Sequence, residues 1–401
     1  MLLITLLACT AGDEPQDTAD PLADCPARDF STDADMDAVV LGNAAFGLDL
    51  YGELPQGNAF FSPLSISAAF GMTTAGTNNN TETELLDVLH VDIPEADWHS
   101  AFGALLTELE ADRSDCGEQL AVANRLFGQQ GYAWQSEFTA LAADDYHAPL
   151  EDIDFIGDPE GSRTHINDWV EDQTEGRIED LLPQGSINDG TRMVLANAIY
   201  FLADWQTQFD PEKTEKGEWR TTGAQVDLMH MEEVSFGLAY GDTYTALELP
   251  YGDGERSMVV YLPHEDDINS LDLGPEDLVD ISFQEQELTR LVLPRFELLD
   301  DTDLKEPMQS LGVLDAWEDG VADFSGLADL EATGESLFIS GAFHKAFVAV
   351  DEAGTEAAAA TAVVVGTESA GPEFVADRAF VFVIRDTRTR QVLFMGRLVE
   401  P

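Results

Sequence analysis

The stretch Asp351-Glu-Ala-Gly-Thr-Glu-Ala-Ala-Ala-Ala-Thr-Ala-Val-Val-Val365 contains no proline and no aromatic side chain. Side chains alternate between the two faces of a β-strand, so one face would carry Thr355, Ala357, Ala359, Thr361, Val363 and Val365. The other face would carry Glu356, which is the only charge after Gly354, followed by Ala358, Ala360, Ala362 and Val364. The segment can therefore enter a β-sheet with an uncharged face inward, because buried alanine loses little side-chain entropy and Gly354 supplies backbone freedom.

Composition alone would favour a different interpretation of this segment. Alanine is the best helix former, and an alanine-rich stretch is also typical of a flexible linker. The neighbouring residues argue against both, because the segment follows a strand-like run at Phe343–Asp351 and precedes another at Phe380–Arg385. Its position predicts a loop between two strands.

The rest of the chain predicts helices first and strands later. An N-terminal cap at Asp33 and helical periodicity predict four further helices after the first, at Thr81–Leu89, Ala96–Leu109, Trp134–Ala142 and Ser162–Gln173. Strand-like runs lie at Ala121–Phe127, Met193–Phe201, Ala246–Pro250, Ser257–Leu262 and Glu287–Glu297. This segregation predicts an α+β fold in one domain.

Six segments of the chain resemble the serpin family, in the family's order and over about residues 34–401. They are Asn58–Ile66, Ala123–Phe127, Ile166–Val170, Ala196–Trp205, Phe343–Ala357, and the pair Ala379–Ile384 with Val392–Arg397. The resemblance implies three β-sheets with about nine helices and an exposed reactive loop. It also implies an inhibitor rather than an enzyme, in which the cleaved loop inserts into the central sheet and traps the acyl-enzyme.

The resemblance assigns roles to individual residues. It implies a hinge at Glu352, Gly354, Thr355, Glu356, Ala357, Ala358, Ala359 and Ala360. It implies a polar cluster beneath the opening point of the sheet, the shutter, at Ser62, Ser65, Asn197 and His344. Trp205 matches the tryptophan at the top of that sheet, the breach, although simple core packing also explains a tryptophan there.

At the loop length that is common in the family, the resemblance implies a reactive bond at Glu368–Ser369, whether the count starts from the hinge or runs back from Phe380. From Thr355 to Glu368 the chain would span roughly 45 Å as a strand. This bond predicts a glutamate-preferring serine protease as the target. A shift to Val365 or Thr367 would favour an elastase- or subtilisin-like protease instead. Two alternatives stay open, namely a non-inhibitory serpin that acts as a binding or carrier protein and a cross-class inhibitor of cysteine proteases.

Net charge excludes several classes of partner. The chain carries 78 acidic and 19 basic side chains and a net charge of −59. Such a surface repels nucleic acid and anionic membranes, and without a basic cluster it predicts no binding of heparin-like polyanions. No metal-binding, phosphate-binding or hydrolase motif occurs, so we expect no metal, no cofactor and no catalytic residue. We expect a monomer.

The N-terminal segment indicates processing. Met1–Ala8 is apolar and ends before Cys9, which resembles a bacterial lipobox, although the segment is short and lacks a basic start. We expect residues 1–8 to be a signal peptide, Cys9 to be lipidated, residues 9–33 to form an acidic disordered tether, and residues 34–401 to fold. A secretory signal without lipidation is the alternative. Either predicts a secreted or cell-envelope protein facing the periplasm or exterior, where Cys25 and Cys116 are a possible disulfide.

Overall fold

The computed structural model describes residues 32–111, 118–355 and 371–401. Several predictions fall outside these ranges and stay predictions. They concern the lipidation of Cys9, the pairing of Cys25 with Cys116, the hinge residues from Glu356 to Ala360, and the bond Glu368–Ser369.

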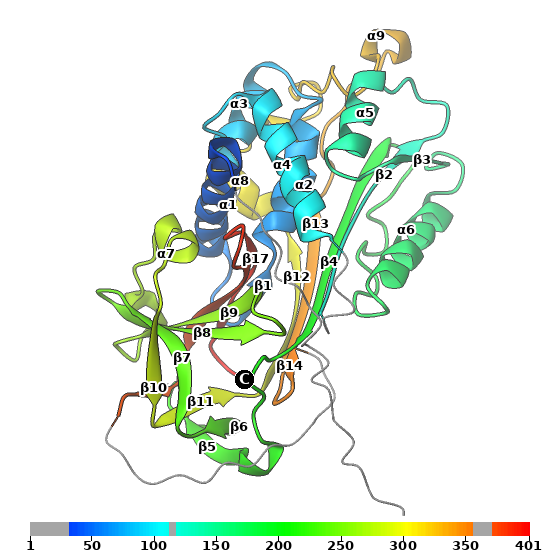
Figure 1. Ribbon diagram of the computed structural model, residues 1–401. Helices are drawn as coiled ribbons and strands as arrows, with labels where there is room; N and C mark the ends of the chain where they lie inside the picture. Colours follow the sequence, from blue (N-terminus) through cyan, green and yellow to red (C-terminus); the bar gives the residue numbers. More distant parts are fainter. Residues whose placement is uncertain (1–31, 112–117, 356–370) are drawn as a thin grey trace, which may run out of the picture.

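The described residues form three β-sheets (Figure 1). The central six-stranded sheet has the order β12 (Phe296–Asp303), β13 (Phe343–Val350), β14 (Gly354–Thr355), β4 (Met193–Asp204), β2 (Glu118–Gln129) and β3 (Leu150–Ile153). A seven-stranded sheet has the order β1 (Ala59–Phe61), β17 (Val392–Leu398), β16 (Phe380–Asp386), β9 (Arg256–Pro263), β8 (Tyr244–Tyr251), β7 (Val234–Tyr240) and β10 (Gln284–Leu288). The four-stranded sheet contains β15 (Glu373–Val375), β11 (Arg290–Pro294), β6 (Ala224–Met231) and β5 (Glu215–Trp219).

Nine α-helices surround these sheets in the part of the chain that the structure describes. They are α1 (Ala34–Glu53), α2 (Pro63–Thr74), α3 (Asn79–Val88), α4 (Glu95–Leu109), α5 (Ser136–Asp144), α6 (Pro159–Gln173), α7 (Pro275–Val279), α8 (Lys305–Leu311) and α9 (Leu330–Thr333). Asp33 caps α1 as predicted, since its side chain accepts a hydrogen bond from the backbone of Met36 at 2.9 Å. The α+β class, the three sheets and the nine helices are confirmed.

The central sheet is covered on both faces. On one face α6 and the chain after it pack against β2 and β4 in a separate apolar cluster that includes Phe127, Ile166 and Val170. On the other face lie α2 and the main core shared with the seven-stranded sheet. Figure 1 shows an elongated molecule, with α5 and α9 at one pole and β5, β6 and β14 at the other.

The run Glu287–Glu297, predicted as one strand, belongs to three strands. It contains the end of β10, all of β11 and the start of β12, which lie in three different sheets. Pro294 cannot donate a backbone hydrogen bond, so the ladder of β11 ends there. The chain then crosses to the central sheet, and the backbone N–H of Arg295 donates to the carbonyl of Asp227 at 2.9 Å.

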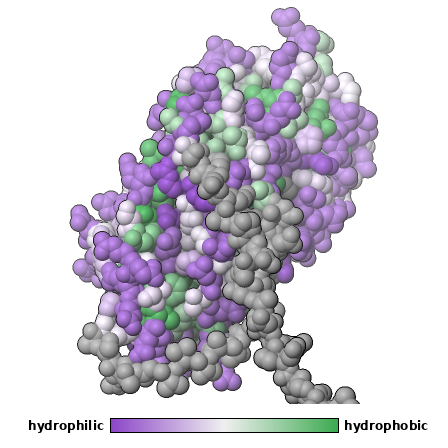
Figure 2. All heavy atoms as spheres, in the orientation of Figure 1, coloured by the Kyte–Doolittle hydropathy of each residue, from purple (hydrophilic) through white to green (hydrophobic). Residues whose placement is uncertain are grey.

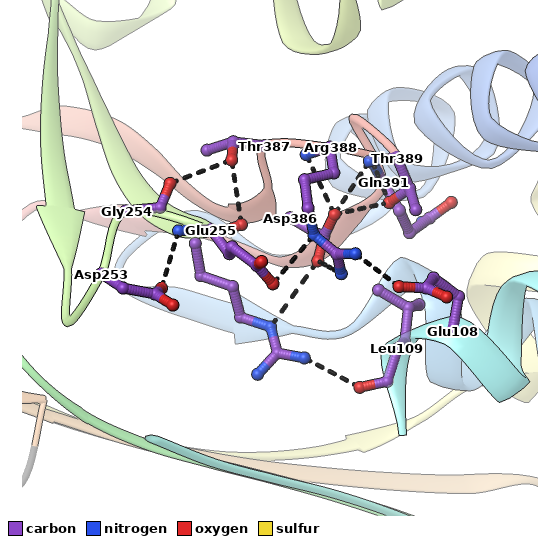
Figure 3. A network of polar contacts seen from close by, with 11 residues as sticks. Glu108, Leu109, Asp253, Gly254, Glu255, Asp386, Thr387, Arg388, Thr389 and Gln391 are labelled. Carbon is purple, nitrogen blue, oxygen red and sulfur yellow. Dashed lines mark hydrogen bonds and ion pairs between the residues drawn. The ribbon is translucent and has the colours of Figure 1, made fainter. Parts of the chain in front are cut away.

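A network of buried charges joins α4 to the seven-stranded sheet (Figure 3). Asp386 is fully buried, and its Oδ2 lies 3.1 Å from Nη2 of Arg388 and 3.9 Å from Nε of Arg256. Arg388 also pairs with Glu255 at 3.0 Å and with Glu108 of α4. Buried charges are costly unless they are paired, so this network acts as one unit.

The described residues include neither a metal-binding cluster nor a membrane-spanning helix. They contain no group of three or more His, Cys, Asp or Glu side chains placed to hold a metal ion. Within the same ranges, no helix is long and apolar enough to cross a membrane.

Candidate hinge and shutter of the central sheet

The start of the predicted hinge already lies within the central sheet. Gly354 pairs with Asp204 of β4, and Thr355 pairs with Ala203 of β4 on one side and Val350 of β13 on the other. These two residues form β14, which is antiparallel to both neighbours. The alternation predicted from the sequence places Thr355 on the inward face, and its side chain is 2% exposed.

Gly354 is required here for space. Its backbone passes so close to β4 that an added Cβ would lie 2.2 Å from the carbonyl oxygen of Ala203 and 2.7 Å from Cα of Asp204. The sequence suggested backbone freedom as the reason for this glycine, but Gly354 is not among the described residues with positive φ. Close approach of two backbones explains the glycine instead.

Trp205 directly follows the C-terminal end of β4 and contacts the hinge. Its indole N–H donates to the carbonyl of Asp351 at 2.9 Å, and its backbone N–H donates to the carbonyl of Ala353 at 2.8 Å. The ring stacks on Tyr251 with 4.4 Å between centroids, and the hydroxyl of Tyr251 lies 2.7 Å from that of Thr355. Trp205 therefore serves both as core packing and as an anchor of the hinge.

Glu352 is clamped in place beside β14. Its carboxylate accepts hydrogen bonds from the guanidinium of Arg295 at 2.5 Å and from the hydroxyl of Thr214, and its backbone carbonyl accepts from Phe209 at 2.8 Å. Burial alone would raise the pKa of Glu352, but the hydrogen bonds from Thr214 and Arg295 outweigh it and lower the pKa. The contribution of this carboxylate to stability is therefore present above the usual glutamate pKa of 4.5 and is lost as the pH falls.

Replacing Glu352 by glutamine should lower the free energy of unfolding at pH 7 by about 2 kcal/mol, because charge-assisted hydrogen bonds are lost. Thermal unfolding of wild type and E352Q at pH 7 and pH 4 measures this difference, which should shrink at pH 4. The matched control is E373Q, because Glu373 is half-exposed and lies 3.9 Å from Arg290. Equal losses in E352Q and E373Q would contradict the clamp.

The four predicted shutter residues come together at the start of α2. The backbone N–H of Ser62 donates to Nε2 of His344 on β13 at 3.1 Å. Ser62 Oγ accepts from the backbone of Ser65 at 3.1 Å, and the hydroxyl of Ser65 donates to the side-chain carbonyl of Asn197 on β4. Strands β13 and β4 are thus bridged from beneath by α2.

Three residues of this network were missed from the sequence. The hydroxyl of Ser62 donates to the backbone carbonyl of Leu393 at 2.6 Å. The amide of Asn197 donates to Asn124 on β2, and the amide of Asn124 donates to the backbone carbonyl of Tyr146 at 3.1 Å. Asn124 lies inside the segment Ala123–Phe127, so its family match was visible but not its role. Tyr146 carried no signal, because its part in the network is played by the backbone.

Strands β13 and β4 are both paired with β14, which lies between them at one end. In the described ranges each of them pairs with β14, and no ladder joins β13 to β4 directly. We call the facing edges of these two strands, Phe343–Val350 and Met193–Asp204, the β13–β4 seam. Gly354 and Thr355 lie at the end of the seam formed by Val350 and Asp204, and the shutter lies farther along the seam, at His344 and Asn197.

His344 is held neutral at the seam. It is buried, and burial lowers its pKa from 6.5 to about 4. The backbone N–H of Ser62 donates to its Nε2, which therefore carries no proton. Protonation would remove this acceptor and leave a charge in the core.

Stability should fall as the pH is lowered from 6.5 toward 4, since the unfolded chain then binds a proton at His344 that the folded chain excludes. The full loss amounts to roughly 3 kcal/mol for a shift of this size. Thermal unfolding between pH 7.5 and 4.5 should show a shallower pH dependence in H344Q than in wild type. The exposed His165, replaced in H165Q, is the control and should follow wild type. Parallel curves for wild type and H344Q would overturn the assignment.

Comparisons with known proteins agree with this geometry. A family model described as serpin (serine protease inhibitor) matches residues 41–401. The chain belongs to the serpin family. It is 37% identical to "Serpin B6" of Macaca fascicularis and 39% identical to "Leukocyte elastase inhibitor" of Sus scrofa, in each case over 91% of this chain and all of the relative.

Solved serpin structures share the fold. Uncleaved ovalbumin matches with a TM-score of 0.79 at 29% identity, over 91% of this chain and all of ovalbumin. Cleaved Serpin 42Da matches with a TM-score of 0.80 at 28% identity, over 92% of this chain and all of that chain. The matching family is described as one of serine protease inhibitors rather than enzymes, and one of the relatives is named for inhibition of an elastase. The two relatives come from animals, so the bacterial origin inferred from Met1–Ala8 stays a prediction.

Proposed function

We propose that this serpin is a suicide-substrate inhibitor of serine endopeptidases, which traps the acyl-enzyme by inserting its cleaved loop along the β13–β4 seam. The observation that carries the proposal is β14. Gly354 and Thr355 are strand residues at the end of the seam beside Val350 and Asp204, and β14 pairs with the strand on each side. Insertion would extend this strand along the seam, between β13 and β4, toward the shutter.

The register of β14 says where each following residue would lie. Continued antiparallel pairing would put Ala357 between Val348 and Phe201, and Ala359 between Ala346 and Ile199. These four neighbours are buried, so the incoming side chains must be small and uncharged. The alternation of the sequence satisfies this demand at each position.

The same register would place Thr361 between His344 and Asn197. Both side chains belong to the shutter, so the one polar residue in this stretch of the inward face would arrive beside two hydrogen-bonding groups. A hydroxyl can donate and accept, which suits a position between an imidazole and an amide. This match supports insertion at least as far as Thr361.

The test is a reaction of the full chain with a glutamate-specific protease, an elastase, a subtilisin and a papain-like enzyme. We expect a complex that survives denaturing gels and a released C-terminal fragment that starts at Ser369. A complex with another fragment would move the bond to Val365 or Thr367, and a complex with the papain-like enzyme alone would favour cross-class inhibition. Cleavage of the serpin without any covalent complex would favour a binding or carrier protein and contradict the inhibitor proposal.

We further propose, from the lipobox-like sequence before Cys9, that the protein is a bacterial lipoprotein tethered by residues 9–33 and exposed to an oxidising compartment. Expression of wild type and C9S in a bacterial host tests this. Wild type should fractionate with membranes and C9S should be released. Equal release of both would favour an unlipidated secretory signal.

A further inference from the structure

Basic side chains are few in this chain, and most of those that the structure describes are paired with carboxylates. The sequence contains 19 basic and 78 acidic side chains. Several arginines lie inside the fold with carboxylate partners, as Arg385 does with Glu248 at 2.9 Å and Arg388 does with Glu255 at 3.0 Å. Further ion pairs hold Arg125, Arg163, Arg192, Arg378 and Arg390. Paired cations are neutralised locally, so the field beyond the surface comes from the surplus carboxylates.

This pattern extends to the pole that carries both ends of the reactive segment. Strand β14, which ends at Thr355, lies near the four-stranded sheet in Figure 1, and Gly371 lies beside Thr289 at the other end of that segment. Thr289, between β10 and β11, donates its backbone N–H to the carbonyl of Pro372 at 3.0 Å. Four cations of this pole have carboxylate partners, namely Lys216, Arg220, Arg290 and Arg295.

Carboxylates at the same pole are exposed. The exposed glutamates of β5, of the β6–β7 turn, of β10 and of the turn before β5 are Glu212, Glu215, Glu218, Glu232, Glu233, Glu285 and Glu287. Hydrophilic side chains also cover most of the face drawn in Figure 2. Among the described residues, the pole beside the reactive segment therefore carries more exposed carboxylates than cations, and four of those cations are already paired.

We propose that the physiological target is a protease of net positive charge, which the field of the whole molecule steers to this pole. The inference rests on the proposed inhibitory function and adds the partner's charge to it. Charge complementarity acts mainly on the association rate and weakens with salt, because the Debye length falls from about 10 Å at 0.1 M to about 3 Å at 1 M. A cationic protease gains from the field, while an anionic protease of the same specificity is repelled.

The experiment compares two proteases that cleave the same bond of this serpin, one with a basic and one with an acidic isoelectric point. The second-order rate constant of complex formation is measured with the full chain at ionic strengths from 20 mM to 1 M. We expect the cationic protease to react at least about ten-fold faster at the lowest ionic strength, with the difference shrinking to about two-fold at the highest. Thermal unfolding at each salt concentration establishes that the serpin is folded.

Two matched sets of substitutions locate the effect. One set neutralises the loop pole with E232Q, E233Q, E285Q and E287Q. The other removes the same number of charges far from it with E137Q, D144N, E318Q and E331Q, in or near α5, α9 and the chain between α8 and α9. At low ionic strength the first set should slow the cationic protease by about two- to five-fold and the second set by less, because screening weakens distant charges.

The outcomes separate the two proposals. Covalent complexes that form at the same rate with both proteases, or at a rate independent of salt, would overturn the charge inference and leave inhibition standing. Equal slowing by both sets of substitutions would overturn the steering to the loop pole. Cleavage of the serpin by both proteases without any complex would instead be a failure of the inhibitory function itself.

Discussion

Exchanging two neighbouring residues of the hinge, in the double variant E356A/A357E, should turn this serpin from an inhibitor into a substrate. Composition and net charge are unchanged, and the carboxylate moves by one residue. In the register of β14 the new glutamate would lie between Val348 and Phe201, both buried. Burying an unpaired carboxylate costs several kcal/mol, and each 1.4 kcal/mol or so slows insertion about ten-fold relative to hydrolysis of the acyl-enzyme.

The measurement is the stoichiometry of inhibition, the number of serpin molecules consumed for each protease molecule trapped. We expect a rise of at least about ten-fold for the double variant, with rapid appearance of cleaved serpin. In the inserted strand Glu356 would lie on the outward face, beside the half-buried Ala349 and Leu202, so the control E356A should stay within about two-fold of wild type. Efficient inhibition by the double variant would refute insertion in this register.

The substitution D386A should destabilise the fold more than any other single change considered for this chain. Asp386 Oδ1 accepts hydrogen bonds from the backbone N–H groups of Arg388 and Thr389 at 3.1 and 2.8 Å, while Oδ2 faces the guanidinium groups of Arg388 and Arg256. Alanine removes the acceptor of the turn and leaves two largely buried cations with less compensation (Figure 3). Breaking a buried ion pair from one side costs about 3–5 kcal/mol.

Chemical unfolding of D386A and D386N separates the two contributions. Asparagine retains an oxygen for the turn but not the charge, so D386N should lie between D386A and wild type in its free energy of unfolding. D37A serves as a surface control, since Asp37 is half-exposed although it pairs with Arg390. A loss below about 1 kcal/mol in D386A, close to that of D37A, would show that the network carries little energy.

Local sequence was sufficient wherever the physical cause is local. The cap at Asp33 and the inward position of Thr355 follow from neighbouring residues, and the structure agrees with both. The alternation from Glu356 to Val365 lies outside the described residues and stays a prediction. The family match added the shutter, which the structure assembles from α2, β4 and β13. The prediction of one strand at Glu287–Glu297 was wrong, because the periodicity of a strand does not indicate which sheet it joins.

Partners distant in the chain were decided by the tertiary structure alone. Tyr251 meets Thr355 across 104 positions, and Arg295 meets Glu352 across 57. No local pattern selects these partners, because the residues next to Arg295 or Tyr251 do not indicate what either side chain contacts, and only packing brings them to the hinge. The reason for Gly354 was likewise invisible, since the backbone that excludes a Cβ there belongs to β4. The sequence by itself determined which segment has the side chains to enter a sheet. The tertiary structure decided between which two strands it would insert and which side chains it would contact there, because those neighbours are distant in the chain.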